Sequence, residues 1–188
     1  MLLLIYLIII KNKMKNKIIT LAQSKTWIGY KTSELTWTIG LAVAIIITPA
    51  ILAHTSANQI ITGTIVNALL FLAAYKLPLV NALAIAIFPS TVALLRGLLP
   101  APMVALIPFI IISNAILIST FSAFKKTPLV GVLTASLLKF GFLYGITYFV
   151  ASRLNADLIT MFQWPQLITA LIGGFVFLTL LKTFSTKN

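Results

Sequence analysis

The chain has 188 residues, of which 60% are hydrophobic and 9% are charged, whereas a soluble domain carries roughly a quarter charged residues. This composition excludes a soluble globular fold, because a domain of this size has too little interior to bury so much apolar surface. Cysteine is absent, which excludes disulfides and thiolate metal sites.

The first 35 residues combine an apolar start with a basic segment. Residues 1–10, MLLLIYLIII, are too few to cross a hydrocarbon core of about 30 Å, and the lysines follow this stretch rather than precede it as in a secretory signal. Residues 11–31 interleave lysines with apolar side chains, which is typical of a helix lying at the membrane interface. We therefore expect this segment to contact lipid, and we expect no nucleic-acid partner despite the net charge of +12.

The rest of the chain predicts an all-α integral membrane protein, a six-transmembrane-helix bundle over residues 36–184, followed by a short tail at 185–188. The spans are expected at 36–53, 60–75, 78–99, 102–124, 128–152 and 165–184. The second is short enough that it is expected to span only partly or to lean on its neighbours. Proline is preorganised for a first helical turn, and four helices are expected to begin at or beside one: Pro78, Pro102, Pro128 and Pro165.

The lysines predict the orientation of these helices. With the N-terminus in the cytoplasm, every basic residue except Arg96, Arg153 and Lys139 is placed on the cytoplasmic side. Cytoplasmic loops carry an excess of Lys and Arg, so both termini are expected to be cytoplasmic. The expected location is the cell membrane, crossed several times.

Two basic residues fall within the predicted spans, where a charge costs ~2.5–3.5 kcal/mol and usually signals function. Lys139 lies midway along the fifth span, and no carboxylate occurs at comparable depth. Helix carbonyls, water in a cavity or an anionic ligand could each stabilise its charge. Arg96 lies nearer the outer end of the third span, where it could instead reach the interface.

Further polar residues are predicted in the outer half of the bundle or at mid-depth. They are Asn67, Asn114, Gln166 and Thr169, with Trp164 at the mouth of the sixth helix. Such groups either cross-link helices or line a pocket that opens to the outside. Pairs of small residues four apart, among them Gly40 with Ala44 and Ala82 with Ala86, indicate either packing within the bundle or docking of another membrane protein.

Enzyme activity is not expected. The one histidine, His54, and the two acids, Glu34 and Asp157, provide neither a hydrolytic triad nor a metal-ligand cluster. A glycine-rich phosphate loop followed by Lys and Ser or Thr is absent from the sequence. We therefore expect no metal and no cofactor, and uphill transport would need energy from a separate subunit.

This combination resembles the S component of energy-coupling factor transporters, the membrane-embedded subunits that capture substrate for vitamin and micronutrient importers. The resemblance covers residues 36–184. Within the family, the chain is similar to a branch whose substrate is unassigned. It is carried by ITGTIVNALLFLAA at 61–74, FPSTVALLRGLLPAPMVALIPFIIISNAIL at 88–117, ASLLKFGFLY at 135–144 and PQLITALIGG at 165–174.

The resemblance implies a pocket on the outer side, lined by residues from 54–59 and by the later helices. Lys139 would pair with an acidic group of a small vitamin-like solute, Asn114 and Gln166 would orient it, and Trp164 would close the mouth. The remaining expected site residues are Asn67, Thr169 and Arg96. The implied partners are a membrane coupling subunit, touched through Gly40, Ala44, Ala82 and Ala86, and two ATPase subunits. Many members of the family carry alanines four apart on the first helix, which Gly40 and Ala44 match imperfectly.

An alternative from the residues alone is a membrane scaffold or assembly factor that acts through its small-residue helix faces. Co-purification distinguishes the two hypotheses, because only the importer subunit would bring ATPases with it.

Overall fold

The computed structural model describes residues 32–52, 58–95, 97, 101–150 and 163–185. The chain divides into two compact units, Met1–Ser33 and Glu34–Asn188, and the account below concerns the second. The expected interfacial segment at 1–31, the loop residues His54 and Asp157, and the tail at 186–188 lie outside the described residues.

The described part of the chain is helical, with no strand. Its elements, in order, are α2 (Thr32–Leu52), α3 (Asn58–Lys76), α4 (Leu79–Ile85), α5 (Phe88–Leu95), the short 3₁₀ helix η1 (Ala101–Leu106), α6 (Ile107–Ala123), α7 (Pro128–Val150) and α9 (Trp164–Ser185). Four begin at or next to a proline as expected: α4 after Pro78, η1 at Pro102, α7 at Pro128 and α9 at Pro165.

Within the described residues, five helices are long and apolar enough to span a membrane: α2, α3, α6 with the end of η1, α7 and α9. The second predicted span is longer than expected, because α3 has 19 residues, about 28 Å at 1.5 Å per residue, and it packs against α9, α6 and α4 as the alternative of leaning on its neighbours predicted. The third predicted span is instead the short one. It consists of two apolar helices, α4 with seven residues and α5 with eight.

Pro89 explains why the third span is broken. A proline cannot donate a backbone hydrogen bond to the carbonyl four residues earlier, and its ring clashes with that carbonyl, which here belongs to Ile85. The chain tightens into a turn at Ala86 and Ile87, and the Ile87 amide donates to the Ala84 carbonyl at 3.4 Å. Helix resumes at Phe88, where Pro89 occupies the first turn and its missing N–H costs nothing.

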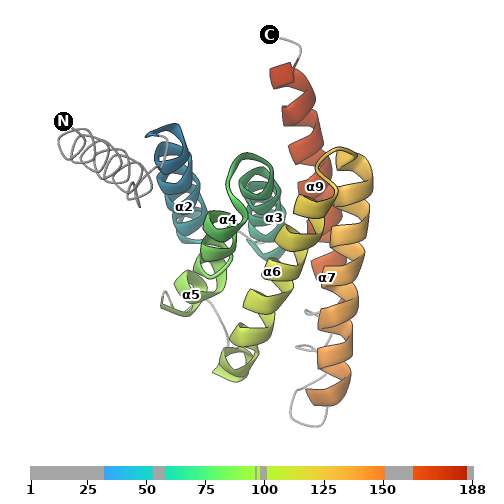
Figure 1. The fold of residues 1–188 in the computed structure, drawn as a ribbon. Helices are drawn as coiled ribbons and strands as arrows, with labels where there is room; N and C mark the ends of the chain where they lie inside the picture. The colour runs from blue at the N-terminus through green and yellow to red at the C-terminus, as the bar shows by residue number, and fades with distance from the viewer. Residues whose placement is uncertain (1–31, 53–57, 96, 98–100, 151–162, 186–188) are drawn as a thin grey trace, which may run out of the picture. The chain divides into compact units, whose positions relative to one another are not determined.

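Four helices, α3, α6, α7 and α9, enclose the core, each packed against the next around the group. Figure 1 shows them side by side, with α4 next to α3 and α6. The contacts between residues indicate that α3 and α9 run parallel and that α7 runs antiparallel to α6. Three fully buried rings, Phe71, Phe121 and Phe177, meet with centroids 5.3–6.0 Å apart.

The close approach of α9 to α3 depends on Gly173. A Cβ atom at this position would lie 2.5 Å from the Thr64 carbonyl oxygen and 2.9 Å from the Ala68 nitrogen. Both are backbone atoms and cannot move aside as the end of a side chain could. Small residues permit such backbone contact between membrane helices, where packing replaces the hydrophobic drive for association.

We therefore expect Gly173→Ala to lower the free energy of unfolding by about 1–3 kcal/mol, the usual cost of overpacking. Gly141→Ala is the matched control, because Gly141 is also helical but has no atom within 4 Å of an added Cβ. That variant should match the wild type or gain up to about 1 kcal/mol. Unfolding in mixed micelles of rising SDS content measures both, and equal effects would contradict the close α3–α9 contact.

The outer surface of the helices is strongly apolar. Val80, Tyr148 and Phe149 are 76–81% exposed, and many other large hydrophobic side chains are at least one-third exposed. In water this surface would be untenable, whereas lipid chains cover it readily. The described part of the chain therefore has the architecture of a multi-pass membrane protein.

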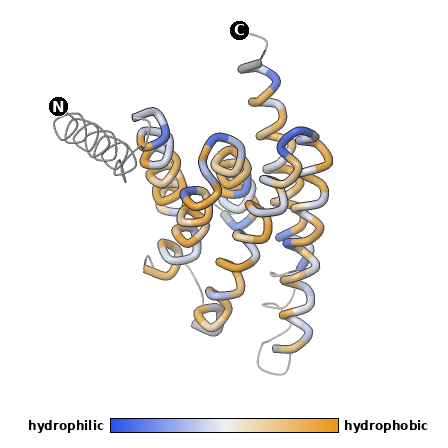
Figure 2. Tube along the Cα trace, in the orientation of Figure 1, coloured by the Kyte–Doolittle hydropathy of each residue, from blue (hydrophilic) through white to orange (hydrophobic). Residues whose placement is uncertain are grey.

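Among the described basic residues, all but Lys139 gather at one end of the helices. Lys76 ends α3, Lys125 and Lys126 form the α6–α7 turn, and Lys182 lies in the last turn of α9. Figure 2 shows hydrophilic residues at this end of α3 and in the α6–α7 turn. Partial burial lowers the pKa of Lys125 from its usual value. We call this the lysine-rich end.

Candidate functional site

Lys139 is the middle residue of the 23-residue helix α7, and only 2% of it is exposed. Its side chain points into the space that α3, α6, α7 and α9 enclose rather than toward lipid, because its partners lie on α3 and α6. A lysine at this depth costs ~2.5–3.5 kcal/mol to insert. The surroundings must therefore stabilise the Lys139 side chain, or Lys139 must have a function that offsets this cost.

Two amide oxygens accept hydrogen bonds from the Lys139 ammonium. The Nζ atom lies 2.7 Å from Oδ1 of Asn67 and 2.8 Å from Oδ1 of Asn114. Both asparagines are buried, at 2% and 3% exposure. Hydrogen bonds from an ionised donor are about twice as strong as neutral ones. Two asparagine side chains, rather than the helix carbonyls, water or ligand considered from the sequence, therefore supply these partners.

A further set of hydrogen bonds fixes the orientation of the Asn67 amide. Its Nδ2 donates to the Gly63 carbonyl at 2.8 Å and to Thr169 Oγ1 at 3.3 Å. The Thr169 hydroxyl in turn donates to the Gln166 carbonyl at 3.3 Å. A charged lysine donates hydrogen bonds and cannot accept one. The Asn67 oxygen therefore faces Nζ, and the Asn67 NH₂ group faces α9.

The Asn114 amide connects Lys139 to the break between α4 and α5. Its Nδ2 lies 3.4 Å from the Ala86 carbonyl oxygen, on the residue where α4 ends. A freed backbone carbonyl at membrane depth needs a partner, because no water is available in the hydrocarbon region. Asn114 therefore accepts a hydrogen bond from Lys139 and donates one to the Ala86 carbonyl at the break between α4 and α5.

We call Lys139, Asn67, Asn114 and Thr169 the lysine cluster. Each member comes from a different helix: α7, α3, α6 and α9. A charged lysine has three N–H donors, and the described residues provide acceptors for two of them. The only carboxylate among the described residues is Glu34, in the first turn of α2. One N–H of the Lys139 side chain therefore has no acceptor among the described residues.

The buried Phe71, Phe121 and Phe177 rings lie between the lysine cluster and the lysine-rich end. Phe71 is one helical turn beyond Asn67, and Phe121 and Phe177 are about two turns beyond Asn114 and Thr169. On the other side of the cluster a buried polar residue follows instead. Thr147, 1% exposed, accepts a hydrogen bond from Gln163 Nε2 at 3.5 Å. Polar character therefore extends from the cluster toward the end of α7, away from the lysine-rich end.

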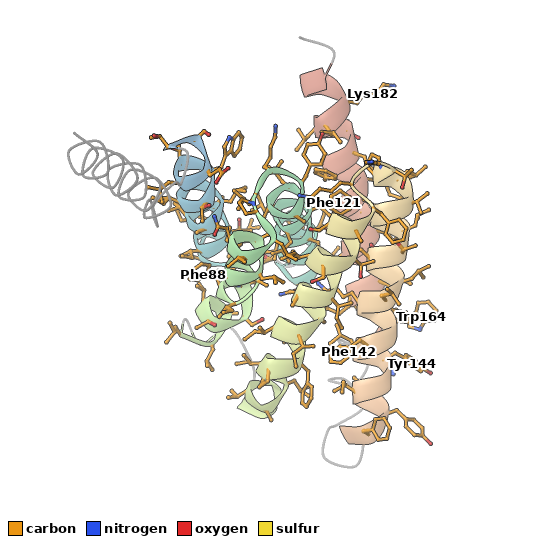
Figure 3. All side chains as sticks on the ribbon, viewed as in Figure 1. Phe88, Phe121, Phe142, Tyr144, Trp164 and Lys182 are labelled. Carbon is orange, nitrogen blue, oxygen red and sulfur yellow. The ribbon has the colours of Figure 1, made fainter. Side chains whose placement is uncertain are left out.

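The other predicted site residues either have side chains outside the lysine cluster or lie outside the described residues. Trp164 is 59% exposed and stacks on Phe140, with ring centroids 5.4 Å apart. Figure 3 shows Trp164 and Tyr144 projecting outward, whereas Phe121 lies inside the helices. Gln166 joins the hydrogen-bond network through its backbone carbonyl. Arg96 and residues 54–57 lie outside the described residues.

The predicted partner face divides into a buried and an accessible half. Ala82 and Ala86 are fully buried within the chain's own core, so neither can touch a partner in this structure. The physical reason is that α4 packs against α3 and α6, and this packing covers both alanines. Gly40 on α2 is exposed with no atom within 4 Å of an added Cβ, and Ala44 is half-buried.

Sequence reasoning missed two groups near the cluster. One is the Ala86 carbonyl, which accepts from Asn114 Nδ2 beside the α4–α5 break. The other is Ser136, which is fully buried, lies three residues before Lys139 on α7, and has a hydroxyl with no hydrogen-bond partner in the described part of the chain. Its spacing from Lys139 places both on one helix face, which is the signal that could have identified it.

Comparison with family models, with curated proteins and with solved structures finds no match for this chain. Its function therefore has to be argued from the lysine cluster and the helices that carry it.

Proposed function

We propose that the protein is the substrate-binding subunit of an ATP-driven importer of the energy-coupling factor type, and that it captures a small anionic, vitamin-like solute from the outer side of the cell membrane. The observation that carries this proposal is Lys139, a buried lysine with no carboxylate near it among the described residues and with one N–H that has no acceptor there. An anionic solute would supply both missing interactions.

The proposed topology has six spanning segments, with α4 and α5 together forming the third, and both termini in the cytoplasm. The grouping of Lys76, Lys125, Lys126 and Lys182 at one end supports this orientation, because cytoplasmic loops are enriched in Lys and Arg. The lysine-rich end is then cytoplasmic and the N-terminal end of α9 faces outward.

The proposed access route leads from the outer side to Lys139. The three buried phenylalanines obstruct the path from the cytoplasmic side, whereas Thr147 and Gln163 offer polar groups toward the outside. Asn67 and Asn114 hold the ammonium in place, and Thr169 holds Asn67. Trp164 and Gln166, near the outer end of α9, would contact the solute as it enters.

A broken helix beside the site also suits a transport protein. Transporters commonly place substrate sites at discontinuous helices near the bilayer midplane, and the α4–α5 break is tied to Lys139 through Asn114. Ala82 and Ala86 are buried, so neither serves as a docking face for a scaffold or for a coupling subunit. The accessible face for a coupling subunit would be α2, around Gly40 and Ala44.

Affinity purification from the native membranes in a mild detergent tests the proposal. We expect a membrane coupling subunit and two ATPase subunits to accompany the tagged protein. Adding bulk to α2 by Gly40→Leu should reduce this recovery at least fivefold, while Gly141→Leu, an exposed glycine of α7 with equally open surroundings, should not. Recovery of the protein without any ATPase would contradict the importer function.

A further inference from the structure

Three buried serine hydroxyls have no hydrogen-bond partner among the described residues: Ser90, Ser122 and Ser136. Most buried polar groups are hydrogen-bonded, so each exception requires an explanation. A helical serine usually satisfies its hydroxyl with a carbonyl in the preceding turn, as Thr134 does with Val130 at 2.7 Å. Ser136 does not, although it lies on the same helix.

Ser136 differs from the other two in its position. It precedes Lys139 by three residues, a spacing that brings two helical side chains to about 5–6 Å from each other. Both are buried, at 0% and 2% exposure. The Lys139 ammonium also has one N–H without an acceptor in the described residues. Two unused donors therefore face the same interior space from adjacent turns of α7.

We infer that Lys139 and Ser136 together bind the carboxylate of a monocarboxylate solute. This inference rests on the proposed function and specifies the chemistry of its ligand. A carboxylate has two acceptor oxygens, one for the free Lys139 N–H and one for the Ser136 hydroxyl. Asn67 and Asn114 keep the ammonium oriented and do not contact the ligand through their oxygens, which Lys139 already occupies.

Charge balance selects a carboxylate over a phosphate. The site offers one positive charge, and the described residues around it add neutral amides and hydroxyls. A phosphate monoester carries close to two negative charges at neutral pH, so one would remain buried without compensation, which is costly. A carboxylate carries one and is neutralised completely.

The neighbouring turns predict an apolar body for this solute. Phe71, Leu117, Ala135 and Leu143 are buried hydrocarbon or aromatic residues within about one helical turn of the cluster, beside the buried hydroxyl residues Ser113 and Ser136. The expected ligand class is therefore a small acid with an aliphatic or aromatic remainder.

Binding to the purified full-length protein in nanodiscs tests this inference. The probes are the aliphatic acids from propanoate to octanoate and benzoate, each compared with its amide and, for the pentyl chain, with pentyl phosphate. We expect at least one acid to bind at least tenfold more tightly than its own amide. The same acid should also bind at least tenfold more tightly than pentyl phosphate. Equal binding of acid and amide, tighter binding of the phosphate, or no binding of any acid would overturn it.

Two serine variants localise the carboxylate. Ser136→Ala removes one hydrogen bond to the ligand and should weaken acid binding about three- to tenfold. Ser122→Ala removes an equally unpartnered buried hydroxyl on α6 and should leave binding unchanged. Identical effects of the two variants would remove Ser136 from the site.

The outcome is separable from that of the importer proposal. Absence of acid binding with ATPase subunits still co-purifying would reject only the carboxylate. Acid binding that depends on Ser136, without any ATPase partner, would reject the importer and retain the site.

Discussion

Lys139→Met leaves the helices folded and strongly weakens solute binding. Methionine fills a similar volume without a charge, so the insertion cost of ~2.5–3.5 kcal/mol disappears while Asn67 and Asn114 keep their amide donations. The binding loss should be about 10–100-fold, as expected for removal of a hydrogen bond between charged groups. Circular dichroism and thermal melting in nanodiscs establish the fold, and equilibrium binding of the retained solute measures the loss.

Lys126→Met is the control for this experiment. Lys126 is exposed in the α6–α7 turn, so its removal changes the net charge equally without touching the lysine cluster. We expect its solute affinity to stay within twofold of the wild type. If both variants bind as the wild type does, Lys139 has a structural role only.

Asn114→Leu destabilises the protein by about 2–4 kcal/mol, because it removes a hydrogen bond to a buried charge and leaves the Ala86 carbonyl without its side-chain donor. The same substitution made in a Lys139→Met background should cost about 1 kcal/mol or less, since only the neutral carbonyl bond is then lost. The difference is the coupling energy between the two side chains. Unfolding in mixed micelles of rising SDS content measures all four proteins of the cycle.

Asn81→Leu provides the matched comparison. Asn81 is also a buried asparagine, 6% exposed, but its Nδ2 donates to the Thr38 hydroxyl on α2 at 3.4 Å. Its substitution should cost the same with Lys139 or Met at position 139. Additive behaviour of Asn114→Leu in both backgrounds would show that Asn114 does not stabilise the ammonium.

The sequence predicted much of the fold because membrane helices leave a strong signal. Long apolar runs and the prolines at 78, 102, 128 and 165 gave most helix starts within a few residues. The exceptions were local. Asn58–Lys76 formed a helix of 19 residues with Asn67 buried at its middle, and Pro89 divided the third span, which the sequence had indicated as one helix.

The sequence singled out the members of the lysine cluster but not their arrangement. Lys139, Asn67, Asn114 and Thr169 were each candidates because polar residues at membrane depth are rare. Which oxygen meets which donor depends on the helix rotations, and these are set by packing such as the contact of Gly173 with α3. The same packing buried Ala82 and Ala86, whose spacing alone cannot distinguish an internal face from a docking face.

The most direct measurement is native mass spectrometry of the protein taken gently from its own membranes, compared with the Lys139→Met variant prepared in the same way. The account predicts one small acidic molecule bound to each wild-type chain and none to the variant. If both proteins carry the same bound species, or the wild type carries phospholipid alone, then Lys139 does not capture a solute and the proposed function is wrong.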